Sequence, residues 1–208
     1  MRLRWVRTLM LGVLGAVFAV AATLSFTSHA SAAPVMADTT IHVTREVSGL
    51  NSPTTMAILG PGDYLVNEKT TGRVQHVVGG VIQPTPALDL PVNWSSERGL
   101  LGIALHPDFP TTPWVYLYYT RSSTSGDTSN SSQVIDNRIV RYTWNGSTLS
   151  TPVDIVHLPV TPGPNHDGGV LLFGPDRKLY AVIGELNRNG QLQNYPAGPA
   201  PDTTGVIL

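Results

Sequence analysis

The 208-residue sequence contains no cysteine. This absence excludes a disulfide framework, so burial of a core alone must stabilise the folded chain. Charge is also scarce, because Asp, Glu, Lys and Arg make up 13% of the residues and the formal net charge is −1. No basic cluster follows the first residues, so the electrostatic footprint of a nucleic-acid or anionic-lipid partner is missing. We therefore expect small molecules or neutral polymers as partners, and no nucleic acid.

The first 32 residues have the form of a signal peptide. Three arginines precede a long apolar segment, and the run Ala-Ser-Ala at 30–32 has the small residues of a cleavage site. Cleavage would leave residues 33–208 as one domain, secreted or in the periplasm or cell envelope, without stable membrane insertion. A retained anchor is the alternative, because residues 9–26 are nearly long enough to span a bilayer.

Beyond residue 40 the sequence lacks a sustained helical period and instead repeats one hairpin pattern. Each copy is an apolar strand, a turn that contains Pro with Gly or Asp, and a second apolar strand, in the segments 54–68, 101–120 and 169–185. Further strand candidates follow at 71–82, 137–149 and 203–208. Irregular copies of an antiparallel unit are typical of β-propeller blades, whereas a β-sandwich is the alternative. We predict an all-β fold of about three blades, with an exposed polar loop at 121–137.

Three blades do not close a ring. Propellers typically have about four to eight blades, and a partial ring exposes unpaired edges. The sequence also stops within a predicted strand, GVIL at 205–208. We therefore expect residues 33–208 to be a partial propeller that is truncated at its C-terminus.

The segment PNHDGGVLLFGPDRKLYAVIGE at 164–185 holds the candidate catalytic pair. Histidine suits a general base, because its ordinary pKa lies near neutral pH. A carboxylate bonded to the other ring nitrogen would fix the tautomer and stabilise the imidazolium. His166 and Glu185 flank a hairpin that turns at residues 174–176, so both lie at its open end. In the alternative interpretation His166 only caps a turn, and Glu185 is a solvated carboxylate at a strand end.

Two blocks, ERGLLGIALHPDF at 97–109 and NHDGGVLLFGPDRKLYAVIGE at 165–185, resemble the glucose/sorbosone dehydrogenase family. These soluble quinoprotein sugar dehydrogenases are secreted or periplasmic six-bladed β-propellers that use pyrroloquinoline quinone (PQQ) and calcium. The resemblance covers essentially the whole of residues 33–208, but only the amino-terminal half of the family domain. It implies an oxidoreductase that acts on a small-molecule sugar with an external electron acceptor.

The resemblance also implies roles for four residues. The family's catalytic histidine corresponds to His166, and its acidic partner corresponds to Glu185, where the glucose dehydrogenases have Asp. Two substrate-contacting positions fall on Glu97 and Asn165, where the characterised glucose oxidisers have Gln and Asp. Glucose itself is thus not implied as the substrate. Glu97 also has a plainer interpretation, a surface ion pair with Arg98.

The family's residues for quinone binding have no counterpart before residue 208, so we expect the cofactor-binding residues beyond that position. The resemblance assigns no metal ligand to these residues. We expect the full-length form to oxidise an aldose at its anomeric carbon and these 208 residues alone to be inactive. The alternative is a non-catalytic extracellular propeller that binds carbohydrate or protein. The discriminating feature would be the downstream sequence with its basic and amide ligands.

Overall fold

The computed structural model describes residues 36–188, 200 and 202–208. The predicted signal peptide and its alternative as an anchor fall within residues 1–35, outside the described residues. The chain divides into two compact units, Met1–Val43 and Thr44–Leu208, and all strands among the described residues lie in the second. The described residues form no helix that is long and apolar enough to cross a membrane.

The first sheet begins with a hairpin that the sequence predicts. Its strands are β1 (Pro53–Gly60), β2 (Asp63–Glu68), β3 (Arg73–Val78), β4 (Val81–Ile82) and β5 (Leu88–Asp89). The order is β1-β2-β3-β4, with β5 also paired to β3. Gly60 pairs with Asp63 across the first turn, and Gly62 has a φ of 68°, a left-handed conformation that favours glycine. The antiparallel hairpin predicted at 54–68 is confirmed.

The second sheet has four antiparallel strands in chain order. They are β6 (Leu100–Leu105), β7 (Trp114–Ser122), β8 (Val134–Trp144) and β9 (Leu149–Leu158). Strand β8 covers residues 137–144 of the strand predicted at 137–149, but the predicted end is wrong, because residues 145–148 reverse the chain between β8 and β9. The loop predicted at 121–137 is shorter than expected, since Ser122 still pairs with Val134.

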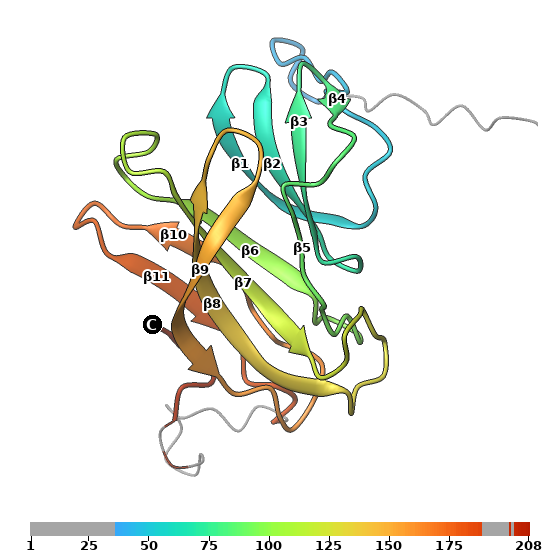
Figure 1. Ribbon diagram of the computed structural model, residues 1–208, viewed down its shortest axis with the longest axis vertical. Helices are drawn as coiled ribbons and strands as arrows, with labels where there is room; N and C mark the ends of the chain where they lie inside the picture. Colours follow the sequence, from blue (N-terminus) through green and yellow to red (C-terminus); the bar gives the residue numbers. More distant parts are fainter. Residues whose placement is uncertain (1–35, 189–199, 201) are drawn as a thin grey trace, which may run out of the picture. The chain divides into compact units, whose positions relative to one another are not determined.

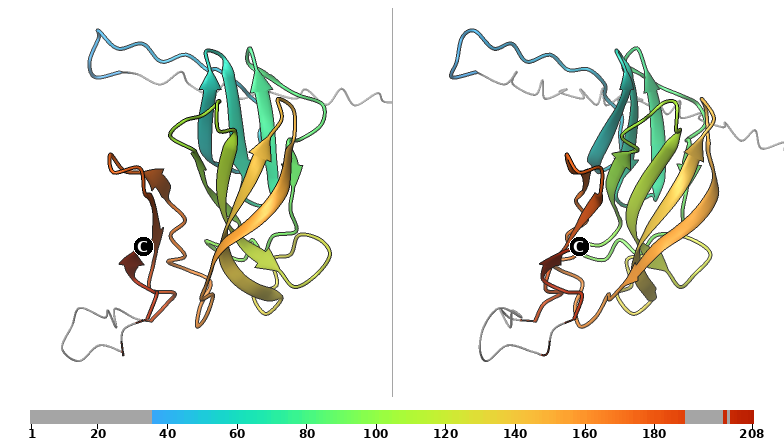
Figure 2. Two further views of the ribbon diagram at one scale, coloured as in Figure 1. Left: turned by 60° about the vertical axis from the view of Figure 1, so that its left-hand side comes forward. Right: turned by 90° about the vertical axis from the view of Figure 1, so that its left-hand side faces the viewer.

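The third sheet contains β10 (Leu171–Phe173), β11 (Leu179–Ile183) and β12 (Val206–Ile207), again antiparallel and in chain order. Its hairpin and the strand candidate at 203–208 agree with the sequence patterns. The three sheets follow one another along the chain from teal through green and yellow to red (Figure 1). Strand β6 contacts β1 in the first sheet and β10 in the third, so the second sheet lies between the other two (Figure 2).

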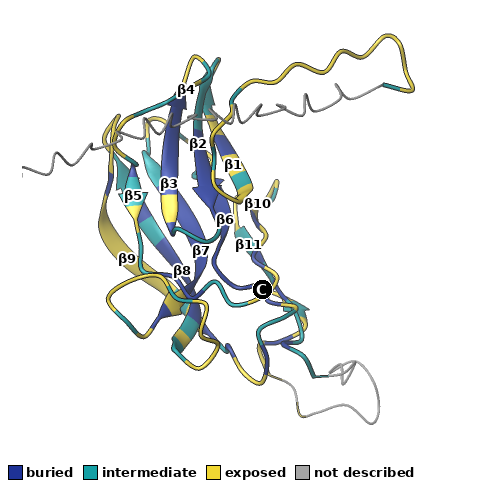
Figure 3. Cartoon of the chain, turned by 90° about the vertical axis from the view of Figure 1, so that its right-hand side faces the viewer, coloured by how far each residue is buried: buried dark blue, intermediate teal, exposed yellow. Residues whose placement is uncertain are grey.

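Two hydrophobic cores fill the spaces on either side of the second sheet. Along β7, Val115, Leu117 and Tyr119 belong to the core shared with the first sheet. The alternate residues Tyr116 and Tyr118 belong to the core shared with the third sheet. Side chains of a strand alternate between its two faces, so burial of both faces explains a continuous apolar and aromatic run. Burial is concentrated in strands such as β3, β6 and β7, whereas β9 is mostly exposed (Figure 3).

Candidate functional site

His166 lies in the loop that leads into β10, and its backbone conformation is unusual. Its φ of 60° is in the left-handed region, which costs about 1–2 kcal/mol for a residue with a side chain. The neighbouring chain leaves little room at this point, because a Cβ added to Gly184 would lie 1.9 Å from the His166 carbonyl oxygen. Glycine at the end of β11 therefore lets the two ends of the hairpin approach closely.

This approach brings the predicted pair together. His166 Nδ1 forms a hydrogen bond with Glu185 Oε1. With a carboxylate as its acceptor, Nδ1 is the donor, and the neutral ring then carries its lone pair on Nε2. The His166 side chain is 56% exposed, whereas that of Glu185 is 14% exposed. The carboxylate thus lies behind the imidazole and leaves the ring accessible.

The hydrogen bond to Glu185 is the main reason why the pKa of His166 is raised above its ordinary value, and burial, the next largest cause, opposes it. The negative charges of Glu185, Glu97 and Asp167 raise this pKa further. The site therefore favours the imidazolium, the form that a general base reaches after it accepts a proton.

Glu97 and Asn165, the other two predicted positions, lie beside His166. Glu97 Oε2 accepts a 2.5 Å hydrogen bond from the His166 backbone N–H, and the Glu97 N–H donates to the Pro164 carbonyl oxygen at 3.1 Å. Asn165 Oδ1 accepts a hydrogen bond from Ser96 Oγ. All four predicted site residues are thus gathered in one place, where the segment before β6, the loop before β10 and the end of β11 meet.

The plainer interpretation of Glu97 as half of a surface ion pair with Arg98 is wrong. Arg98 is 2% exposed and is the largest of the fully buried side chains in the described residues. Its guanidinium lies near Asp167, with 3.9 Å between Nε and Oδ1, and Asp167 is fully buried. Arg98 and Asp167 are site residues that the sequence analysis missed. In the sequence, the only indication that they belong to the site is that each directly follows a predicted site residue.

A groove of about 360 Å³ borders the pair. It is lined by His166, the end of β11 with Glu185, and the segment that contains β12. The groove is open to solvent, and the exposed imidazole of His166 forms part of its lining.

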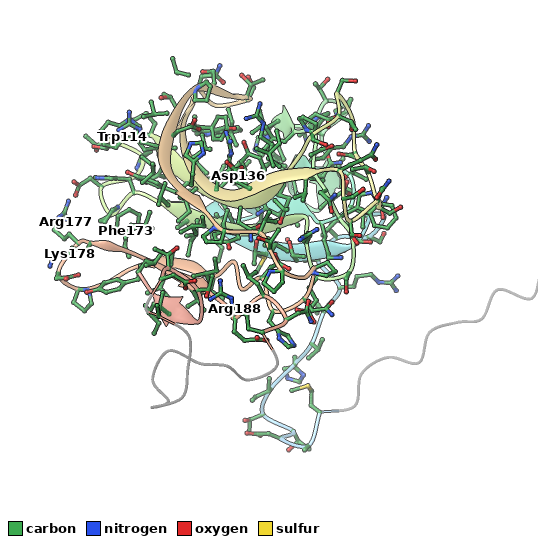
Figure 4. All side chains as sticks on the ribbon, turned by 90° about the horizontal axis from the view of Figure 1, so that it is seen from below. Trp114, Asp136, Phe173, Arg177, Lys178 and Arg188 are labelled. Atoms are coloured by element: carbon green, nitrogen blue, oxygen red, sulfur yellow. The ribbon has the colours of Figure 1, made fainter. Side chains whose placement is uncertain are left out.

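The charges next to His166 are acidic. Lys69 Nζ donates to the Ser96 carbonyl oxygen at 2.5 Å, and Arg188 Nη1 lies 2.6 Å from Asp202 Oδ2, so both of these cations already have partners. Arg177 and Lys178 belong to the turn of the β10–β11 hairpin and lie away from Arg188 (Figure 4). Within the described residues, no group of three or more His, Cys, Asp or Glu side chains could hold a metal ion.

A family model described as "Glucose / Sorbosone dehydrogenase" matches residues 50–199. Among characterised proteins, quinoprotein glucose dehydrogenase B of Acinetobacter calcoaceticus is 34% identical over 150 residues, which are 69% of this chain and 30% of the relative. Hedgehog-interacting protein of Mus musculus is 30% identical over 152 residues, or 67% of this chain and 21% of the relative. The chain thus spans about a third or less of the length of these relatives.

Two solved structures resemble the fold. A Thermus thermophilus protein described by assignment as an oxidoreductase (glucose dehydrogenase) matches with a TM-score of 0.62 and 30% identity, over 76% of this chain and 49% of that one. The PQQ-bound aldose sugar dehydrogenase of Streptomyces coelicolor matches with a TM-score of 0.60 and 35% identity, over 75% of this chain and 45% of that one. The prediction of an all-β propeller is confirmed, and the three sheets are its blades.

Proposed function

Because the chain belongs to the glucose/sorbosone dehydrogenase family, we propose that it carries the proton-accepting part of a site that oxidises an aldose at its anomeric carbon. His166 is the general base, and Glu185 is its orienting partner. The observation that carries the proposal is the hydrogen bond between His166 Nδ1 and Glu185, combined with the exposure of the imidazole beside a groove.

The geometry suits removal of a hydroxyl proton. A sugar hydroxyl in the groove would donate to His166 Nε2, and transfer of its proton would convert the ring to imidazolium. The positive charge would then form next to the Glu185 carboxylate, which stabilises it at short range. Because Nδ1 is held by Glu185, the ring cannot flip without the loss of this bond.

Glu97 and Asn165 are the proposed sugar-contacting residues. The Glu97 carboxylate holds the His166 backbone through Oε2, which leaves Oε1 as a possible acceptor for a sugar hydroxyl. Asn165 has an amide that can both donate and accept, and its oxygen is already bonded to Ser96. These two side chains would orient the substrate hydroxyls toward Nε2, and this orientation would determine which sugar binds.

The residues next to His166 do not by themselves fit a quinone cofactor. PQQ is rich in carboxylates and needs cations or amides to hold it, whereas the charged groups that act on His166 are Glu185, Glu97 and Asp167. PQQ and calcium therefore belong to the proposal through the family alone, and the electron acceptor must be held by other groups. Residues 1–208 alone are accordingly expected not to oxidise sugar. The proposal includes a secreted or periplasmic location for the full-length form, after removal of residues 1–32.

A second candidate function is binding without catalysis. It is favoured by the similarity to Hedgehog-interacting protein, whose name denotes a protein that interacts with another protein. In this case the propeller would bind a carbohydrate or a protein, and the His166–Glu185 pair would only brace the loop.

One experiment distinguishes the two candidate functions. The protein, as residues 33–208 and as any longer natural form, would be titrated with PQQ and calcium, and oxidation of a panel of aldoses would be followed with an artificial electron acceptor. The proposal expects quinone binding and sugar oxidation in a longer form, and loss of oxidation in His166→Ala.

The matched control is His157→Ala. His157 is similarly exposed, at 53%, and its Nδ1 also contacts a carboxylate, Asp136 Oδ2 at 2.7 Å. This variant should retain activity. A folded longer form that binds no quinone and oxidises no aldose would refute the dehydrogenase and leave the binding propeller.

A further inference from the structure

Arg98 holds together three segments of chain that surround the His166 loop. Its Nη1 donates to the Ser131 carbonyl oxygen at 2.9 Å. Its Nη2 donates to the carbonyl oxygens of Val160 at 2.5 Å and Gly163 at 3.3 Å. Two of these acceptors lie within the six residues that precede His166. A single buried side chain therefore fixes the path of the chain as it approaches the candidate base.

Asp167 fixes the chain on the other side of His166. Its Oδ1 accepts a 3.0 Å hydrogen bond from Asn137 Nδ2, and its backbone carbonyl oxygen accepts a 2.9 Å hydrogen bond from the Tyr118 hydroxyl. Asn137 and Tyr118 belong to the central strands β8 and β7. The residue next to His166 is thus anchored to the central sheet of the fold.

The Arg98–Asp167 pair is not arranged for maximal stability. The 3.9 Å between Nε and Oδ1 is too long for a hydrogen bond, and both Arg98 Nε and Asp167 Oδ2 are buried without a hydrogen-bond partner among the described residues. Burial raises the pKa of Asp167 and lowers that of Arg98, so each group is shifted toward its neutral form. Buried pairs of this kind are often no more stable than apolar residues of similar volume. The contribution of the Arg98–Asp167 pair is therefore better explained by the geometry that it gives to the His166 loop than by added stability.

We propose that Arg98 is a positioning residue for His166, which it holds in place through the carbonyl oxygens of Val160 and Gly163 and through the charge of Asp167. This inference rests on the proposed function of His166 as a base. It adds that the orientation of the base depends on a guanidinium that touches neither the imidazole nor the groove. The charged groups that face His166 are Glu185 at the end of β11, Glu97 before β6 and Asp167 in its own loop.

The test measures His166 directly, without sugar or cofactor. The imidazole Cε1–H of His166 would be followed by NMR as pH is varied, with the signal assigned by its loss in His166→Asn. Exchange of the His166 backbone amide with deuterium would be measured on the same samples. Arg98→Lys keeps the positive charge but cannot reach all three carbonyl oxygens, so we expect a shifted titration midpoint and at least about tenfold faster amide exchange.

A double variant distinguishes the loss of positioning from simple unfolding. Removal of Arg98 alone would leave a buried unpaired carboxylate, whereas Arg98→Met with Asp167→Asn removes both charges. Because the charge of Asp167 raises the pKa of His166, the midpoint should move to lower pH in this double variant. The matched control is Arg138→Met with Asp136→Asn, which removes another largely buried pair. It should leave the His166 signal unchanged.

The outcomes separate this inference from the proposed function. An unchanged midpoint and an unchanged exchange rate in folded Arg98→Lys would overturn the positioning role. An equal disturbance of His166 by the Arg138 control would overturn it as well, because the effect would then be general loosening. Sugar oxidation is measured separately, so its absence would reject the dehydrogenase and leave the result for Arg98 standing.

Discussion

His166 and Glu185, which are 19 residues apart, meet side chain to side chain at the open end of the β10–β11 hairpin. The contact depends on both ends of the hairpin. His166 takes a left-handed backbone conformation, and Gly184 has no side chain to keep the two segments apart. The pair is thus produced by local chain geometry, and its chemistry can be tested by changing either side.

Glu185→Gln should lower the pKa of His166, because the hydrogen bond to Glu185 is the largest cause that raises it. The neutral base would then exist at lower pH, so the acidic limb of a kcat/KM profile should shift to lower pH. The rate on the plateau should fall about 10- to 100-fold, since the imidazolium loses its partner. NMR titration of His166 checks the first effect, and sugar oxidation by a longer form checks the second.

The same pair has a predictable effect on stability. A raised histidine pKa contributes stability that is complete below the ordinary value of 6.5 and is lost as pH rises through the raised value. Glu185→Gln should therefore be destabilising mainly below pH 6.5. Glu97→Gln is the control, because Glu97 bonds to the His166 backbone and its charge is a smaller cause of the shift. The midpoint of urea denaturation would be measured for both variants below pH 6.5. An equal shift of this midpoint in the two variants would contradict the assignment of Glu185 as the main partner.

Gly184→Ala should disturb the site without any change of charge. The added methyl group would lie 1.9 Å from the His166 carbonyl oxygen, and backbone cannot move aside as a flexible side chain can. We expect a loss of about 1–3 kcal/mol in the free energy of unfolding and a changed His166 NMR signal. Gly126→Ala is the matched control, since nothing lies within 4 Å of a Cβ at that position. A Gly184→Ala variant that is as stable as this control would show that the two segments are not held close in solution.

The hairpins and the candidate pair could be predicted because their signals are local. Turns with Pro and Gly, followed by apolar strands, mark each hairpin, and the ends of a hairpin necessarily lie near one another. Strand β9 could not be found in the same way. Its burial pattern is mostly exposed, so its side chains lack an apolar alternation, and Pro152 lies within it.

Local sequence patterns do not predict the buried residues that surround His166. Arg98 looks like a surface charge in sequence, and its burial follows from carbonyl groups contributed by Ser131, Val160 and Gly163, up to 65 residues away. Asp167 similarly depends on a residue of β8, Asn137. Such groups are recognised only when the tertiary structure shows where backbone acceptors lack other partners.

Tyr118→Phe should test the anchor of Asp167. The Tyr118 hydroxyl is buried and donates to the Asp167 carbonyl oxygen at 2.9 Å. Its removal leaves that carbonyl unpaired, which costs about 1–3 kcal/mol in the free energy of unfolding. Tyr116→Phe, two residues along the same strand and facing the same core, provides the control, and we expect little change there. Urea denaturation of both variants gives the comparison, and equal midpoints would argue against an anchoring hydroxyl.

The outer face of the third sheet should make the isolated domain associate with itself. Val170, Leu172 and Ile207 are 50%, 51% and 71% exposed, and they line an apolar groove of about 500 Å³. A contiguous apolar surface of this kind promotes association in water. Leu172→Lys places a charge in the groove and should lower the association of residues 33–208, measured by sedimentation velocity over a range of concentrations. Val81→Lys is the control, because Val81 is 61% exposed on β4, in a different sheet. If the two variants associate equally, the groove is not the surface through which the domains meet.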